Sequence, residues 1–273
     1  LTLLITSIAS AQDFKGIATY KSQRKMEIQL DSTHMNEDMR NQMMAMLKKQ
    51  FEREYTLTFN NEASIYKQVD QLDKPSAIAN GGMEMVVIGS GDSDVLYKNI
   101  AENRFVNQNE LFSKLFLIKD QLEVPEWTLE KETKNIGEYT CFKATYTRKV
   151  MMNTSMTMSI NGDGDDEEPE EEEVEQTITA WYTLQVLVSH GPGNYTGLPG
   201  LILEVSDGSE TILCSKIVLN PKDGVAIKEP TKGKVVNQAE YDAIMEKKMN
   251  EMNVRRNSNR RDDGNSIEIR IGG

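Results

Sequence analysis

Residues 201–219 read LILEVSDGSETILCSKIVL, and this stretch decides the fold that the sequence predicts. Leu201 to Val205 is strongly apolar, Asp207-Gly208 has the composition of a tight turn, and Thr211 to Leu219 returns as a second strand. Strands joined by so short a connection pair antiparallel. The stretch therefore predicts a β-hairpin and, with it, an antiparallel sheet.

Two glycine–proline turns precede this hairpin, in His190-Gly-Pro-Gly193 and in Gly197-Leu-Pro-Gly200. Glycine reaches backbone angles that are closed to other residues, and proline fixes one angle. The turns are therefore expected to direct the following apolar strand into the core. The alternative is a rigid recognition loop. Its candidate binding residues are Gly197, Leu198, Pro199, Gly200, Tyr195 and Trp181.

Strand patterns with hairpin-length connections recur along the rest of the chain, whereas only two helices are expected, from Thr33 to about Arg53 and from Asn237 to Met252. The expected strands include Phe14–Leu30, Tyr55–Phe59, Ser64–Val69, Val95–Val106, Leu111–Lys119, Trp127–Thr133, Glu138–Arg148 and Thr177–Val188. Such a chain predicts a mainly β (α+β) fold, a curved antiparallel sheet packed by one or two helices. By analogy of architecture alone, this resembles the half-barrel of lipoprotein carriers.

The first eleven residues, LTLLITSIASA, are apolar and uncharged and end in Ala9-Ser10-Ala11. This ending is typical of a signal-peptidase site, so residues 1–11 are interpreted as a truncated signal peptide and Gln12 as the mature start. The alternative is a short buried strand or helix. Export to the periplasm, or to the periplasmic face of the outer membrane, is therefore expected. No later stretch is apolar for long enough to span a bilayer, so no transmembrane segment is expected in the mature chain.

The mature chain is expected to form a single β-rich domain, residues 12–252, followed by a polar tail, residues 253–273. The tail ends in Asn265-Ser-Ile-Glu-Ile-Arg-Ile271, which alternates as a short strand does. Two cysteines, Cys141 and Cys214, lie in strand-like segments. In an oxidising compartment they form either one disulfide or two buried thiols, and the sequence leaves both open.

The net charge of −12 comes mostly from one acidic run in an expected loop insertion, residues 161–176. Without the ten acids of that run the net charge is −2, which excludes the basic face that nucleic-acid binding needs. Five side chains of the run match the ligand positions of a calcium loop, but Asp166 stands where such a loop needs glycine. A solvated spacer or diffuse cation binding is the alternative. The five residues are Asn161, Asp163, Asp165, Glu167 and Glu172.

The chain has 15 methionines, and the group Met151, Met152, Met156 and Met158 resembles the thioether clusters that hold Cu(I). The alternative is a methionine-rich surface strand. Otherwise no cofactor is expected. His190 is not accompanied by a Gly-x-Ser-x-Gly elbow or a Cys–His signature, so no catalytic residues are predicted.

Residues 180–205, with the hexapeptide Gly197-Leu-Pro-Gly-Leu-Ile202 at their centre, resemble the signature of the GLPGLI family. The segment Trp127 to Ala144 resembles that family as well. The resemblance implies an exported protein of Bacteroidota with no assigned activity, often encoded beside TonB-dependent outer-membrane receptors. It therefore implies a protein partner at the outer membrane.

These features together predict a non-enzymatic, exported accessory or interaction protein of the cell envelope. The alternative is a periplasmic carrier of a small hydrophobic ligand, or of Cu(I) bound through the methionines. The sequence does not indicate the oligomeric state.

Overall fold

The computed structural model describes residues 14–24, 52–69, 94–153, 157–158, 171–259 and 269–270. Its main element is a twelve-stranded sheet in the order β13-β6-β5-β4-β3-β2-β1-β12-β11-β10-β8-β7. The strands of this sheet are β1 (Lys15–Arg24), β2 (Arg53–Asn60), β3 (Ala63–Gln68), β4 (Val95–Asn99), β5 (Arg104–Leu111), β6 (Lys114–Gln121), β7 (Thr128–Ile136), β8 (Tyr139–Asn153), β10 (Glu171–Thr183), β11 (Leu201–Ser206), β12 (Glu210–Leu219) and β13 (Lys234–Val236). The mainly β prediction is confirmed.

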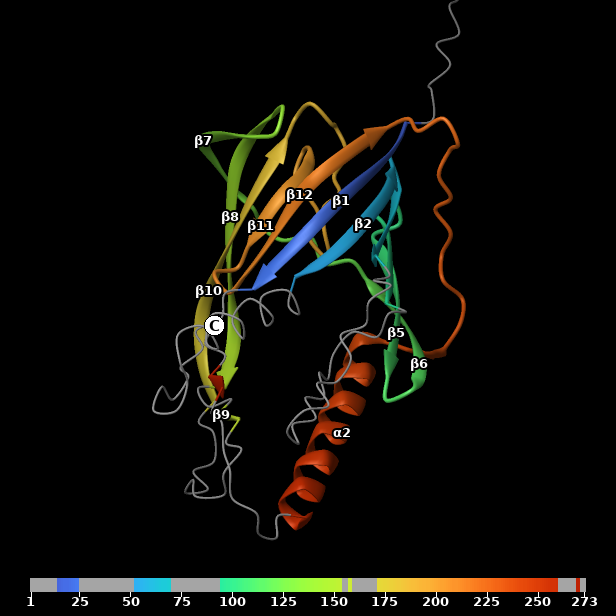
Figure 1. Ribbon diagram of the computed structural model, residues 1–273, viewed down its shortest axis with the longest axis vertical. Helices are drawn as coiled ribbons and strands as arrows, with labels where there is room; N and C mark the ends of the chain where they lie inside the picture. Colours follow the sequence, from blue (N-terminus) through green and yellow to red (C-terminus); the bar gives the residue numbers. More distant parts are fainter. Residues whose placement is uncertain are drawn as a thin grey trace, which may run out of the picture.

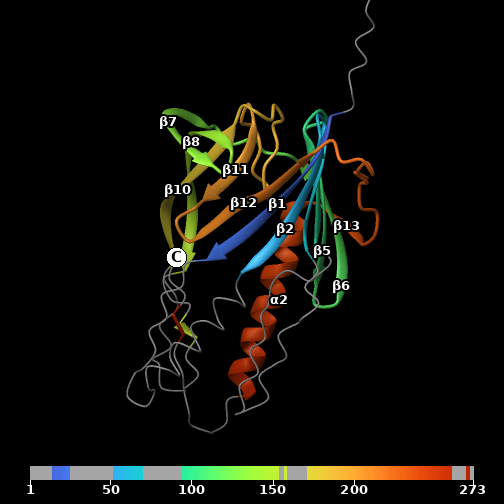
Figure 2. The ribbon, with the colours of Figure 1, turned by 45° about the horizontal axis from the view of Figure 1, so that its top comes forward.

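Neighbouring strands run antiparallel throughout this sheet, except that β13 pairs with β6 in parallel. Figures 1 and 2 show the sheet bending from β8 on one side to β6 on the other, so that it forms an open trough. The hairpin predicted from residues 201–219 is present as β11 and β12, with Asp207 at its turn.

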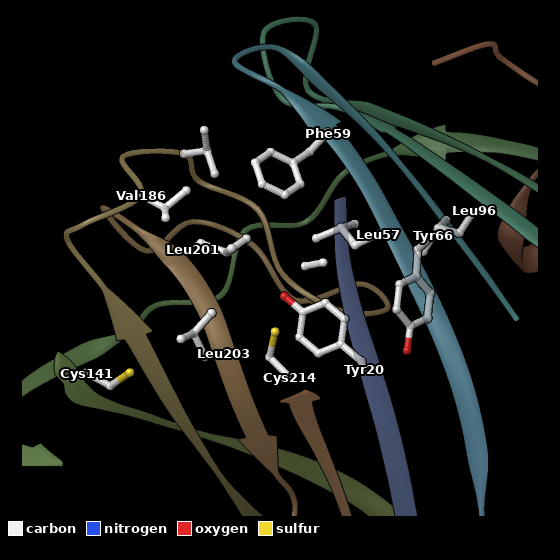
Figure 3. Packing of buried hydrophobic residues seen from close by; sticks show 12 residues of the cluster. Tyr20, Leu57, Phe59, Tyr66, Leu96, Cys141, Val186, Leu201, Leu203 and Cys214 are labelled. Atoms are coloured by element: carbon white, nitrogen blue, oxygen red, sulfur yellow. The ribbon is translucent and has the colours of Figure 1, made fainter. Parts of the chain in front are cut away.

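Alternation along the strands divides the core between the two faces of the sheet. On β1, Gly16, Ala18, Tyr20 and Ser22 are buried, whereas the residues between them are partly or fully exposed. The inner cluster joins side chains of β1 to β4 with side chains of β8, β11 and β12 (Figure 3). A second cluster, on the outer face of β8, β10 and β11, contains Ile178, Ala180 and Ile202.

Helix α2 (Gln238–Asn259) packs by its first turns against the inner side of β5 and β6 (Figure 1). It begins with a capping box: the Asn237 side chain accepts from the Glu240 amide, and the Glu240 carboxylate accepts from the Asn237 amide. Tyr241 lies edge-on to Phe116, and its hydroxyl donates to the Asn109 side chain at 2.6 Å. The helix expected over 237–252 is therefore present and continues by seven residues.

Several expected strand boundaries are wrong. Leu111, the expected start of a strand over 111–119, is the last residue of β5, and β6 begins at Lys114. Residues 95–106 form two strands, β4 and β5, because the chain turns between Ile100 and Asn103. The strand expected over 177–188 ends at Thr183. At its other end it begins at Glu171, so residues 171–176 of the expected acidic loop belong to β10 and pair with β8.

The tail contains a two-residue strand, β14 (Ile269–Arg270), within the segment that alternates in sequence. It pairs with β9 (Thr157–Met158) in a separate two-stranded ladder rather than with an edge of the main sheet. The interpreted signal peptide, residues 33–51 of the expected first helix, and residues 161–170 of the acidic run lie outside the described residues. Arg53, the expected end of that helix, is the first residue of β2.

Candidate functional site

Residues 184–200 connect the end of β10 to the start of β11 through an irregular path, and we call its second part, residues 189–200, the glycine–proline turn. A Cβ atom on Gly200 would lie 2.0 Å from the Thr183 carbonyl oxygen, and one on Gly191 would lie 2.7 Å from Ile202 Cδ1. Neither position has room for a larger residue. The turn is therefore packed directly against the two strands that it connects.

The outer side of the turn is closed by the segment that precedes β7. Trp127 Nε1 donates to the Thr196 carbonyl oxygen at 2.8 Å, and Val124 lies against Gly197, whose φ is +92°. Leu198 is 1% exposed and belongs to the outer cluster, which Tyr195 also contacts. The leucine of the hexapeptide is thus a packing residue.

The inner side of the turn is held by Lys98 of β4, which is fully buried. Its ammonium donates to three backbone carbonyl oxygens of the turn, those of Gly191 at 2.9 Å, Gly193 at 2.6 Å and Tyr195 at 3.1 Å. Burial lowers the pKa of Lys98 to about 7. β4 and β11 are separated by four strands in the sheet, so this side chain joins the two arms of the trough.

His190 is also fully buried, and its ring lies 6.2 Å from that of Phe59. Nε2 lies 3.0 Å from the Asn60 carbonyl oxygen, which only accepts, so Nε2 carries the proton. Nδ1 has no hydrogen-bond partner among the residues that the structure describes. Burial, and secondarily the charge of Lys98, lowers the pKa of His190 to about 3.

His190 therefore stands neutral in the core, and no carboxylate among the described residues orients its ring. A general base needs such an orienting partner and access to a substrate. The arrangement around His190 supports a packing role, which the sequence did not indicate.

The structure brings together five of the six predicted binding residues, namely Tyr195 and residues 197–200. Trp181 lies apart from them. It packs at the edge of the inner cluster, with Lys134 Nζ 4.4 Å from its ring centroid. Lys134 in turn pairs with Glu204 at 2.6 Å. Trp181 is thus a neighbour of the turn in sequence only.

The predicted metal ligands are only partly described. Met151 is 61% exposed, Met152 and Met158 are placed by their backbone alone, and Met156 lies outside the described residues. Of the suggested calcium ligands, Glu172 lies on β10 opposite Met152. Asn161, Asp163, Asp165 and Glu167 lie outside the described residues. Within the described ranges, no group of three histidine, cysteine or acidic side chains is placed to hold a metal ion.

Cys141 and Cys214 are both buried free thiols of the inner cluster. Cys141 is on β8 and Cys214 is on β12, with β10 and β11 between them. Two strands therefore lie between the cysteines, and neither thiol forms a disulfide in this structure. Burial raises the pKa of Cys141 to about 11 and that of Cys214 to about 12, so both thiols stay protonated at neutral pH.

Four apolar residues around the turn are exposed, and we call them the apolar strip. Val124, 53% exposed, touches Gly197, and Pro199 is exposed two residues further on. Leu184, 43% exposed, adjoins Gly200, and Leu187 is 74% exposed. Two members of the strip, Val124 and Leu184, therefore lie next to glycines of the turn. Gln185, Asn194 and Gly197 are exposed in the same region, but none of them has a large apolar side chain.

Sequence reasoning missed Lys98 and most of the strip. Lys98 lies in the strand Val95–Asn99, where a lysine is usually an outward-facing residue. The available signal is the position of Lys98 two residues after Leu96. Residues two apart in a strand point to the same face, so an apolar Leu96 indicates that Lys98 is buried as well. Leu187 falls within a strand in the sequence prediction, which does not indicate its exposure.

Comparison with known proteins gives a family match over part of the chain but no activity. Residues 127–204 match a family described as a protein of unknown function (Porph_ging). This match does not confirm the GLPGLI family name. No curated protein matches the sequence significantly.

Among solved structures, that of PNGF-II in a C2 space group is similar, with a TM-score of 0.47 and 14% identity. The similar region covers 84% of this chain and 32% of PNGF-II. The structure of PNGF-II in a P21 space group gives the same TM-score and identity, with 33% of that chain covered. This chain therefore spans about a third of the length of PNGF-II, and a similarity this distant carries no functional argument.

No helix in the part of the chain that the structure describes is long and apolar enough to cross a membrane.

Proposed function

We propose that this chain is a non-enzymatic, exported accessory protein of the cell envelope that binds a protein partner through the apolar strip. The observation that carries the proposal is the exposure of Val124, at 53%, against Gly197 of the turn, together with that of Leu187, at 74%, in the segment that leads into the turn. Exposed apolar side chains that gather around one rigid segment are typical of protein-binding surfaces.

The fixed conformation of the turn favours binding. Gly191 and Gly200 are packed against neighbouring atoms, and Lys98 bonds three carbonyl oxygens of the turn. A surface that is already ordered loses little conformational entropy when a partner docks. The strip is therefore presented in one arrangement rather than in many.

Acidic side chains next to the strip indicate the charge that the partner carries. Glu123 and Glu126 are exposed and flank Val124 and Pro125 in sequence. An apolar centre with an acidic border complements a partner segment that carries apolar side chains beside lysine or arginine. We place this partner at the outer membrane, on the basis of the interpreted signal peptide and the family resemblance.

Site-specific photo-crosslinking in the producing cells tests the proposal. A photoreactive residue in place of Leu187 is expected to give one envelope protein as a crosslinked product. A photoreactive residue in place of Val235, equally apolar and 63% exposed on β13 at the far edge of the sheet, is the matched control and should not give it. A Val124→Glu substitution should lower the yield of the Leu187 crosslink at least tenfold.

Either an equal yield from both positions or an unchanged yield with Val124→Glu would contradict the docking role. Amino-terminal sequencing of the protein recovered from the periplasmic fraction tests export separately. A start at Gln12 is the expected result, and recovery of the unprocessed chain in the cytoplasm would overturn that part.

A further inference from the structure

The ammonium group of Lys98 occupies a pocket of backbone oxygens. Alternate residues of the turn, Gly191, Gly193 and Tyr195, point their carbonyl oxygens at Nζ over distances of 2.6 to 3.1 Å. A lysine ammonium has three N–H donors and accepts nothing. The number of donors thus equals the number of acceptors, so each carbonyl oxygen has one partner.

The charge inside this pocket is balanced by dipoles and not by an acid. No carboxylate in the described ranges forms an ion pair with Lys98, and burial alone shifts its pKa. Among the described residues, His190 is the one titratable group with an electrostatic effect between it and Lys98. His190 is neutral, because burial and the positive charge of Lys98 both lower its pKa. An uncompensated buried cation is costly unless hydrogen bonds replace the water that it has lost.

The chemistry of the pocket selects a class of cation. Calcium and magnesium sites use shorter oxygen distances, ~2.0–2.6 Å, and normally include carboxylates. Rings of backbone carbonyls at longer distances replace the hydration shell of a large monovalent ion. Ammonium and potassium belong to that class.

We propose that the carbonyl oxygens of Gly191, Gly193 and Tyr195 form a cage for an ammonium-type monovalent cation, and that Lys98 fills this cage from within the chain. The lysine is a positioning residue: by filling the cage it fixes the conformation of the glycine–proline turn against β4. The cage sets this conformation whether or not the apolar strip docks a partner, so the two proposals can fail separately.

Chemical rescue tests the cage. Lys98→Ala removes the cation and leaves space for a free one, whereas Lys98→Met removes the cation and fills the space with a chain of similar length. Trp127 reports the position of the turn because its indole bonds Thr196. A Trp181→Phe background leaves Trp127 as the sole tryptophan. Measurements at pH 6 keep Lys98 charged in the parent protein, since its pKa is about 7.

Both variants are expected to shift the emission of Trp127 and to speed amide exchange in residues 190–198 at least tenfold. Ammonium or potassium chloride at about 0.1 M should restore at least half of the parental protection to Lys98→Ala and none to Lys98→Met. Tetramethylammonium chloride, too large for the cage, controls for ionic strength and should restore nothing.

Parental exchange rates in Lys98→Met would show that the turn needs no cation, and equal rescue by all three salts would show that the cage has no selectivity. Either result overturns the proposal. If Lys98→Ala is recovered unfolded, its refolding yield in ammonium against tetramethylammonium chloride decides the question by the same rule.

Discussion

The hydroxyl of Tyr20 on β1 donates to the carbonyl oxygen of Ile202 on β11 at 2.7 Å, across the strand β12 that lies between them. The ladder between β11 and β12 begins only at Glu204, so Ile202 lies before that pairing starts. The register of β1 against β12 also shifts between Thr19 and Tyr20. The tyrosine thus supplies the hydrogen bond that an irregular part of the sheet lacks.

Tyr20→Phe is expected to lower the free energy of unfolding by about 1–2 kcal/mol, because it leaves the buried Ile202 carbonyl without this donor. Urea denaturation monitored by circular dichroism measures the change. Tyr182→Phe is the matched control, since the Tyr182 hydroxyl makes no hydrogen bond among the described residues and the residue is also largely buried. Equal effects of the two substitutions would show that the Tyr20 bond contributes nothing specific.

Gly200→Ala is expected to cost about 3 kcal/mol of stability, because the new methyl group would lie 2.0 Å from the Thr183 carbonyl oxygen and the backbone must move. Gly224→Ala is the control. Gly224 has a φ of +66°, but a methyl group added there would meet no atom within 4 Å, so only the backbone cost of about 1 kcal/mol applies. Thermal unfolding of both variants separates the cost of the steric clash at Gly200 from the cost of a positive φ at Gly224. A smaller effect at Gly200 than at Gly224 would contradict the tight packing of the turn.

The antiparallel sheet could be predicted from local patterns, because hairpins such as the one between β11 and β12 contain both strands and turn within about twenty residues. Turns without glycine were the main source of error. Asn103, Phe112 and Ser113 have positive φ values although none is glycine, so the breaks on either side of β5 lack the glycine that most clearly marks such a turn. The charge of residues 171–176 favours a loop, and their pairing with β8 cannot be deduced from composition.

The candidate site, too, could be predicted from the sequence only as far as local patterns reach. The glycines of the turn indicate tight packing by themselves, and the structural interpretation of them agrees with Gly191 and Gly200. The contacts that decide the conformation join residues far apart in sequence, such as Lys98 and Gly193. No local pattern contains both members of such a pair, so the role of Lys98 required the topology of the sheet.

Asp94→Asn is expected to stabilise the protein at pH 7.5. Burial raises the pKa of Asp94 to about 6, so the folded state binds a proton that the unfolded state has released. Stability from this group is therefore present below about pH 4 and is lost as the pH rises through 6. Asparagine still accepts from the Asn109 side chain, which bonds Tyr241 of α2.

Denaturation midpoints at pH 7.5 and pH 4 measure the effect, which should be largest at pH 7.5 and absent at pH 4. The exposed Asp223→Asn is the control and should change neither midpoint. A destabilised Asp94→Asn at pH 7.5 would mean that the negative charge itself holds the contact to Asn109.

His190 makes the fold sensitive to acid. The buried imidazole has a pKa of about 3, whereas an unfolded histidine has one near 6.5, so below pH 6.5 the unfolded state binds a proton that the folded state excludes. The stability contributed by neutral His190 is complete above pH 6.5 and falls as the pH drops toward 3. A difference of this size amounts to about 3 kcal/mol by pH 4.

His190→Gln keeps a donor for the Asn60 carbonyl oxygen but does not titrate, so it is expected to lose stability less steeply than the parent protein between pH 6.5 and pH 4. Urea unfolding at pH 7, 5.5 and 4 gives the two slopes, and their difference removes the contribution of the carboxylates that titrate in both proteins. Parallel curves for the parent and His190→Gln would mean that His190 reaches solvent and is protonated while the protein stays folded.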